Sequence, residues 1–249
     1  MSFYSEWNNL IANWDKNPVS LQPLAFGNSG LDFCYLPEPY YGDMNNCSIV
    51  IINLNPGGGL PEQRWNSTSP GNLVIDVRLK DYNGYATSFP PLNGNYPTVG
   101  KNWWRKRAAW IGRILASKGI TSIKDPFAIE LCPFHSHSWK IKNATKYVKN
   151  FIYVTGIDII DAIETGIRNS DAQLGIAIGK SIYKVLLSCG YCDVSPFPFS
   201  PIPNNCREYH LLEKDGVKIM CTWTRGGNLP PAPRFDPFEK NIISNTIKP

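Results

Sequence analysis

The chain has few charged residues, few histidines and no long apolar run. Charged side chains make up 18% of the 249 residues, and histidine occurs three times. No apolar stretch approaches the roughly 20 residues of a membrane-spanning helix. The first residues lack the basic and apolar regions of a secretory signal. These absences argue against a membrane or exported protein, so we expect a cytoplasmic protein with reduced thiols and no membrane partner.

The composition is that of a protein with a packed core, because 43% of the residues are hydrophobic. We find no linker and no repeat, and therefore expect a single domain over residues 1–249. An N-terminal helix and irregular wrap would occupy residues 1–46, and a long insertion loop residues 60–95. The net charge of +5 is compatible with a polyanionic partner, although many soluble proteins share it.

Apolar runs alternate with stretches of helical periodicity along the chain. The runs predict four strands, at 47–54, 127–132, 172–178 and 217–224. Periodicity predicts helices at 5–15, 101–118 and 180–188, and one or two helices over 144–168 with a break at Gly156. This order favours right-handed βαβ crossovers. The fold class is therefore α/β, as a three-layer α/β/α sandwich around a mostly parallel, four-stranded sheet.

The first strand ends abruptly in Asn53-Leu54-Asn55-Pro56-Gly57-Gly58-Gly59. Pro56 cannot donate to a ladder, and glycine permits backbone angles that other residues avoid. The other predicted strands end in equally polar stretches, at 132–139, 179–180 and 224–228. Because ligands of open α/β sheets bind at the carboxyl ends of the strands, we expect these stretches to share one cleft.

These strand ends resemble the motifs of one enzyme family. Asn53–Gly57 resembles the Gly-x-Asn-Pro-Gly motif of mismatch-specific uracil/thymine-DNA glycosylases, within the uracil-DNA glycosylase superfamily. Thr98–Lys101 resembles the start of that superfamily's next helix, and Ile129–Phe134 occupies its strand ending in a base-reading Asn. Gly175–Ser181 resembles its later strand-Gly-helix junction, and Thr222–Gly226 stands at its last motif. The resemblance implies a uracil-DNA glycosylase-like fold.

The sequence also departs from the family pattern. Asn53 replaces the first Gly, and Glu130 stands near the expected base-reading Asn. The last motif has neither His-Pro-Ser nor Asn-Pro-Ser, and the iron–sulfur cysteines of some members are absent. The resemblance implies no cofactor.

By resemblance, Asn55 is the residue that positions a water under C1′ of the nucleotide. The alternative is that Asn55 makes an Asx-type turn before Pro56. His135 would donate to the leaving base, with His137 beside it. The two histidines could instead bind a metal with added carboxylates, or be ordinary loop residues.

Several further residues are candidates for contacts to a base or a phosphate. Glu130 could accept from the exocyclic amine of a base, or be structural if paired to a Lys. Arg225, next to Gly226, could hold a phosphate. The remaining candidates would contact the ligand from the loop after the first strand, by stacking on a base, or as a cation: Asn53, Pro56, Gly57, Tyr96, Phe89 and Lys180.

Two basic clusters accompany aromatic residues. One lies on the predicted helix at 101–118 with three tryptophans, and the other at 140–149. Such clusters suit nucleic-acid backbones and stacked bases, but more often such a helix has a solvated basic face over buried Trp.

Seven cysteines are present. Cys189, Cys192, Cys206 and Cys221 could form a metal site, or they could be buried thiols.

The leading hypothesis is a monofunctional DNA glycosylase-like hydrolase that removes a damaged or mismatched, uracil-type base, acting as a monomer on DNA. The alternative is a non-catalytic member of the same fold that binds nucleic acid or a nucleotide. A third reading is a cleft used for protein contact.

Overall fold

The computed structural model describes residues 3–16, 30–35, 37–57, 98–117, 119–121, 124–136, 144–195 and 207–224. Its helices are α1 (Phe3–Lys16), α4 (Thr98–Ser117), α5 (Ala144–Thr155), α6 (Ile159–Asn169) and α7 (Lys180–Ser188). Its strands are β1 (Tyr40–Tyr41), β2 (Val50–Asn53), β3 (Phe127–Glu130), β4 (Leu174–Ile178), β5 (Cys192–Asp193), β6 (Arg207–Lys214) and β7 (Val217–Thr224).

The strands form one sheet in the order β1-β3-β2-β4-β7-β6-β5. The four strands predicted from the sequence are β2, β3, β4 and β7, and they pair in parallel at the centre of this sheet. β1, β5 and β6 extend it in antiparallel pairing. The α/β class with a mostly parallel sheet is confirmed, whereas the predicted sheet of four strands is too small, because seven are present in the described residues.

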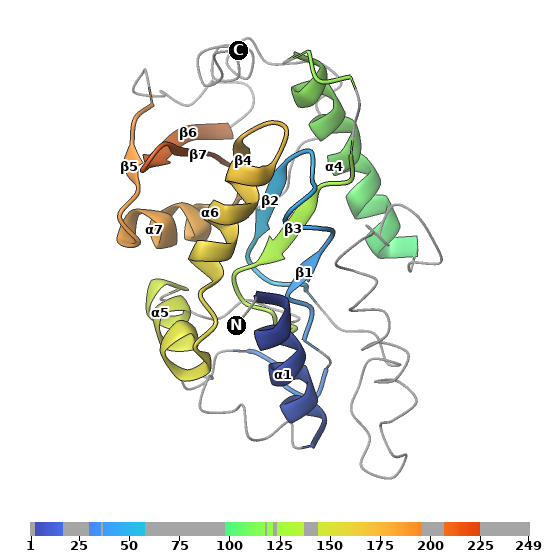
Figure 1. Ribbon diagram of the computed structural model, residues 1–249, viewed down its shortest axis with the longest axis vertical. Coiled ribbons are helices and arrows are strands. Elements are labelled where there is room, and N and C mark those ends of the chain that lie inside the picture. Colours follow the sequence, from blue (N-terminus) through green and yellow to red (C-terminus); the bar gives the residue numbers. More distant parts are fainter. Residues whose placement is uncertain are drawn as a thin grey trace.

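Helices cover both faces of the sheet (Figure 1). On the α4 face, Trp104 and Ile114 share one hydrophobic core with Ile51 and Ile176. On the opposite face, residues of α1, α5, α6 and α7 share a second core with β2, β3, β4 and β7. Because both faces of β2 and β4 are buried, their sequences are continuous apolar runs.

The predicted helices are present, with ends that shift by a few residues. The stretch 144–168 forms two helices, as α5 ends before Gly156, which has φ +72°. The Asp158 carboxylate then caps α6 by accepting hydrogen bonds of 3.0 Å from the backbone N–H groups of Ile160 and Asp161. Glycine tolerates this left-handed backbone, so it separates the two helices where the sequence predicted a break.

Strand β6 was not predicted, because its sequence mixes charged and apolar residues without the apolar run of a central strand. The sequence of the hairpin turn between β6 and β7 could have predicted this strand. Asp215 and Gly216 both have positive φ, of 50° and 77°. An Asp-Gly pair with these angles is typical of a tight hairpin between antiparallel strands.

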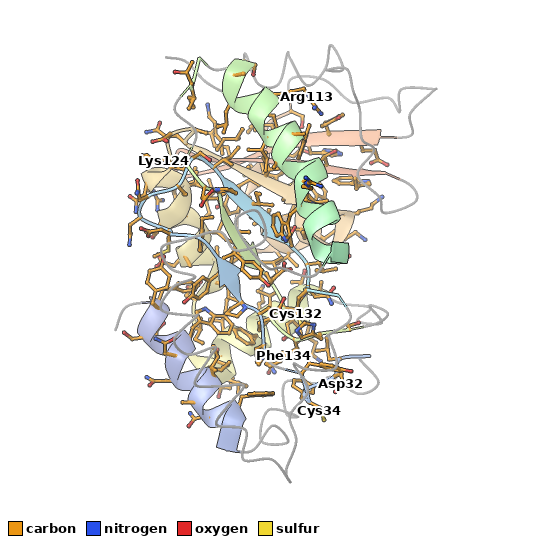
Figure 2. All side chains as sticks on the ribbon, turned by 90° about the vertical axis from the view of Figure 1, so that its right-hand side faces the viewer. Asp32, Cys34, Arg113, Lys124, Cys132 and Phe134 are labelled. Atoms are coloured by element: carbon orange, nitrogen blue, oxygen red, sulfur yellow. The ribbon has the colours of Figure 1, made fainter. Side chains whose placement is uncertain are left out.

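The carboxyl ends of the parallel strands lie at one edge of the sheet. Lys124, which precedes β3, and Cys132 and Phe134, which follow it, lie at opposite ends of the sheet in Figure 2. Backbone hydrogen bonds continue past the strands, because the N–H of Leu131 donates to Asn53 and that of Cys132 to Leu54. The loops after β2 and β3 therefore leave the sheet side by side.

Candidate functional site

The last residues of β2 and β3 form a buried polar pair. Asn53 and Glu130 are partners in the parallel register, and each is 5% exposed. The Asn53 Nδ2 donates a hydrogen bond of 3.0 Å to Glu130 Oε1. Since side chains alternate along a strand, both point to the face that Ile51 and Ala128 share with α4. The sheet therefore presents an amide–carboxyl pair toward α4 at its carboxyl edge.

Glu130 is held in conditions that favour its neutral form. Its second oxygen, Oε2, is buried and has no hydrogen-bond partner among the described residues. Burial raises the pKa of the Glu130 carboxyl to about 8; the Asn53 hydrogen bond opposes the shift and the charge of Glu38 adds to it. Burial therefore favours the protonated form of the carboxyl.

Arg107 of α4 and Glu38 bring opposite charges toward Glu130. Arg107 is 9% exposed, and burial lowers the pKa of its guanidinium to about 9 while the charge of Glu130 acts the other way. Glu38 accepts a hydrogen bond of 2.6 Å from the Tyr41 hydroxyl. The segment of Glu38 lies along the end of β3, because the Glu130 N–H donates to Pro39.

Asn55 lies in the loop that follows β2. Its side chain is partly buried, and its Nδ2 is buried without a hydrogen-bond partner in the part of the chain that the structure describes. Gly57, with φ +84°, accepts a hydrogen bond of 2.6 Å from the Ser136 N–H. This bond fixes the loop of Asn55 and Pro56 against the residues after β3, so Asn55 and His135 belong to neighbouring loops.

His135 is more deeply buried than its predicted role requires. It is 2% exposed, and its Nε2 lies 3.9 Å from Glu38 Oε1. Its ring packs against Tyr35, with centroids 5.7 Å apart. The backbone carbonyl of His135 also accepts from the N–H of Asp32. In this conformation His135 is part of the packing around Glu38.

Lys180 lies at the same edge of the sheet but over its other face. It is the exposed first residue of α7, and its Nζ lies 5.8 Å from the centroid of the Trp223 ring. Trp223 belongs to the core on the α5–α7 side. The structure therefore does not bring the Lys180 side chain together with Asn53 and Glu130.

The remaining predicted contacts lie outside the described residues: Phe89, Tyr96, His137, Arg225 and Gly226. On the predicted basic helix, Arg105 is exposed whereas Arg107 turns toward the sheet. Trp104 and Trp110 are buried in the core beneath. Of the second cluster, Lys146 and Lys149 are exposed on α5.

The cysteine positions do not favour a shared metal site. Cys192 is exposed on β5 and Cys221 is buried in β7, and β6 lies between these strands. Two strand spacings amount to about 9–10 Å, more than a shared metal can span. Within the described ranges, no group of three or more His, Cys, Asp or Glu side chains could hold a metal ion. Cys206 lies outside those ranges.

Three further residues line this edge: Glu38, Arg107 and Thr222. Sequence reasoning did not name Glu38 or Thr222 as site residues, and it placed Arg107 in a basic cluster for nucleic-acid contact. Thr222 pairs with Ile178 at the carboxyl end of β7 and is fully buried. The burial of Arg107 could have been predicted, because it stands three residues after Trp104 and four before Ile111, within the apolar stripe of α4. A cation on an apolar stripe indicates a buried charge with a role.

Comparison of the chain with protein-family models, curated proteins and solved structures finds no match. The resemblance to uracil-DNA glycosylases thus stays a prediction. None of the described helices has the length and apolar character needed to cross a membrane.

Proposed function

We propose that this protein is a DNA glycosylase-like hydrolase that removes a uracil-type damaged or mismatched base from DNA. The observation that supports it most is that two of the buried polar groups without hydrogen-bond partners among the described residues lie at the ends of β2 and β3. These are the Nδ2 of Asn55 and the Oε2 of Glu130. Buried polar groups are normally satisfied, so an unsatisfied one calls for an explanation, and a functional role is one of them.

Asn55 is proposed to position the attacking water. Its loop is tied to the residues that follow β3 by the hydrogen bond of 2.6 Å that the Ser136 N–H donates to the Gly57 carbonyl. An amide side chain can hold a water in place without acting as a strong base. The transition state of such a reaction is oxocarbenium-like, so orientation of the water contributes more than its deprotonation.

The proposed reaction is hydrolysis of the bond between C1′ and the base. The water oxygen forms a bond to C1′, and the electron pair of the C1′–N bond leaves with the base. One proton of the water then passes to the departing base or to solvent. A hydrogen-bond donor near the base stabilises the negative charge that develops on it. We assign this role to His135, which would have to turn from Glu38 toward the base.

Arg225 and the backbone at Gly226 are proposed to hold phosphates, and Tyr96 to stack on a base. His137 and Lys180 are proposed as further contacts to the nucleic acid. A flipped base would enter at the strand ends, since enzymes that act on a base take it out of the stack.

The second candidate is a non-catalytic protein that binds nucleic acid or a nucleotide in the same cleft. The burial of His135, with 2% of its surface exposed, favours it. A leaving-group donor has to reach the ligand, whereas a packed histidine beside Glu38 only shapes the site.

Incubation with uracil, hypoxanthine, xanthine or a thymine mismatch, in duplexes and single strands, separates the two candidates. Abasic sites that disappear in Asn55→Ala while binding persists support the hydrolase. Tight, salt-sensitive binding without abasic sites supports the binding protein. Failure to bind or cleave any of these substrates would contradict both.

A further inference from the structure

We infer that Glu130 determines the specificity of this site by acting as a neutral acid, which donates a hydrogen bond to a carbonyl oxygen of the ligand. The site would then accept a base that carries a carbonyl where its competitor carries an amino group, such as uracil against cytosine. The inference rests on the proposed function and adds the residue and the protonation state that select the base.

The hydrogen bonding of Glu130 supports the neutral form. An ionised carboxylate offers about four acceptor positions, yet the one hydrogen bond recorded to the Glu130 side chain comes from the neutral amide of Asn53, at 3.0 Å. The second oxygen, Oε2, is buried and has no partner among the described residues. A buried carboxylate with a single neutral donor is unstable, and such a group takes up a proton instead.

The groups around Glu130 fit this assignment. β2 contributes the amide of Asn53, and α4 contributes the cation of Arg107. The segment before β1 contributes the carboxylate of Glu38, against which the His135 ring lies at 3.9 Å. Arg107 and Glu38 act on Glu130 in opposite directions. The neighbouring charges therefore offset one another, and burial decides the state of Glu130.

A neutral Glu130 presents a defined pattern to a base. Oε1 accepts from Asn53, so the free Oε2–H is a donor. Uracil carries a carbonyl acceptor at its 4-position, as thymine does, whereas cytosine carries an amino donor there. The Oε2–H would donate a hydrogen bond to the carbonyl of uracil. In cytosine it would face the amino group, which is also a donor. An ionised Glu130 would have the opposite preference and select the amine.

Binding of single-stranded oligonucleotides with one central uracil or cytosine tests the inference. Fluorescence anisotropy is measured from about pH 6 to about pH 9, in an Asn55→Ala background so that the base stays attached. We expect about a tenfold preference for uracil at pH 6, the size of one hydrogen bond against an unpaired donor. The preference should fall as Glu130 loses its proton, and at pH 9 it should turn toward cytosine.

Two substitutions sharpen the result. Glu130→Gln keeps an acceptor for Asn53 and a permanent donor, so its uracil preference should not change with pH. Glu130→Leu should bind both oligonucleotides alike. Glu213→Gln is the matched control, because Glu213 lies on β6 opposite Cys192, away from the site. It should keep the pH dependence of the parent protein.

The protonation state can also be measured without a ligand. The difference infrared spectrum of the parent protein against Glu130→Gln should show the C=O band of a protonated carboxyl at pH 7. A carboxylate band there, or a preference for cytosine at pH 6, would overturn the inference. If cleavage of uracil proceeds but Glu130→Gln keeps a pH-dependent preference, the inference fails and the proposed function stands. If no oligonucleotide binds or is cleaved, both fail.

Discussion

The Asn53 amide donates a hydrogen bond of 3.0 Å to the Glu130 carboxyl across two neighbouring parallel strands. The pair ties together the strand ends from which the loops of Asn55 and His135 leave the sheet. Asn53 has a partner in the fold, whereas the Asn55 Nδ2 has none among the described residues. Replacement of Asn53 should therefore lower the free energy of unfolding more than replacement of Asn55.

Asn53→Ala should destabilise the protein by about 1–3 kcal/mol, because it leaves the buried Glu130 carboxyl without its recorded donor. The free energy of unfolding in urea measures this loss. Asn169→Ala is the control, since Asn169 makes an exposed amide hydrogen bond of 3.2 Å to Asn45. That substitution should cost about 0.5 kcal/mol or less. Equal costs for the two would contradict a structural role for the Asn53–Glu130 bond.

Asn55→Ala should change stability by no more than about 0.5 kcal/mol, because it removes an amide whose buried Nδ2 makes no hydrogen bond in the described structure. Urea unfolding of the parent and the variant gives the difference. A cost as large as that of Asn53→Ala would indicate that Asn55 is held in an Asx-type turn and serves the fold.

Stability should fall as the pH rises from about 4.5 to about 8. Burial raises the pKa of Glu130 from 4.5 to about 8 in the folded protein, so the folded state binds more protons than the unfolded state in that window. The stabilisation is complete below the unfolded pKa and is lost as the pH passes the folded one. Urea unfolding across this range should show the fall, and Glu130→Gln should flatten it. An unchanged slope in the variant would show that another group is responsible.

Glu38→Gln should lower the pH at which the stabilisation from the neutral Glu130 is lost. The charge of Glu38 raises the pKa of Glu130, so its removal makes the ionised form of Glu130 less costly. A glutamine keeps an acceptor for the Tyr41 hydroxyl, which donates to Glu38 over 2.6 Å. The carboxyl band of Glu130 in infrared spectra, followed against pH, measures the shift. Movement to higher pH would contradict this electrostatic account.

The central strands and main helices could be predicted because their signals are local. β2 and β4 are continuous apolar runs buried on both faces, and α7 has the range predicted for it, Lys180–Ser188. The added strands carry weaker signals. β1 has two residues, and β6 is held in the sheet by pairing with β7 at eight positions. Pairing is a tertiary property, so propensity alone does not reveal it.

The site was predictable in outline, since polar strand ends of parallel strands meet at one edge. The sequence pointed to Asn53, Asn55 and Glu130, but it could not show that Asn53 and Glu130 bind one another. Nor could it show that Glu38 approaches from the segment before β1. These contacts join residues far apart in the chain, and their positions follow from packing against the sheet.

The most direct test of the account is hydrolysis of uracil-containing DNA. Free uracil and the abasic product are measured by mass spectrometry, for the parent protein and for Asn55→Ala. The account predicts both products from the parent protein, and loss of both in Asn55→Ala while DNA binding is kept. Release of uracil at the same rate by Asn55→Ala, or DNA binding by the parent protein with no release of uracil, hypoxanthine, xanthine or mismatched thymine, would contradict it.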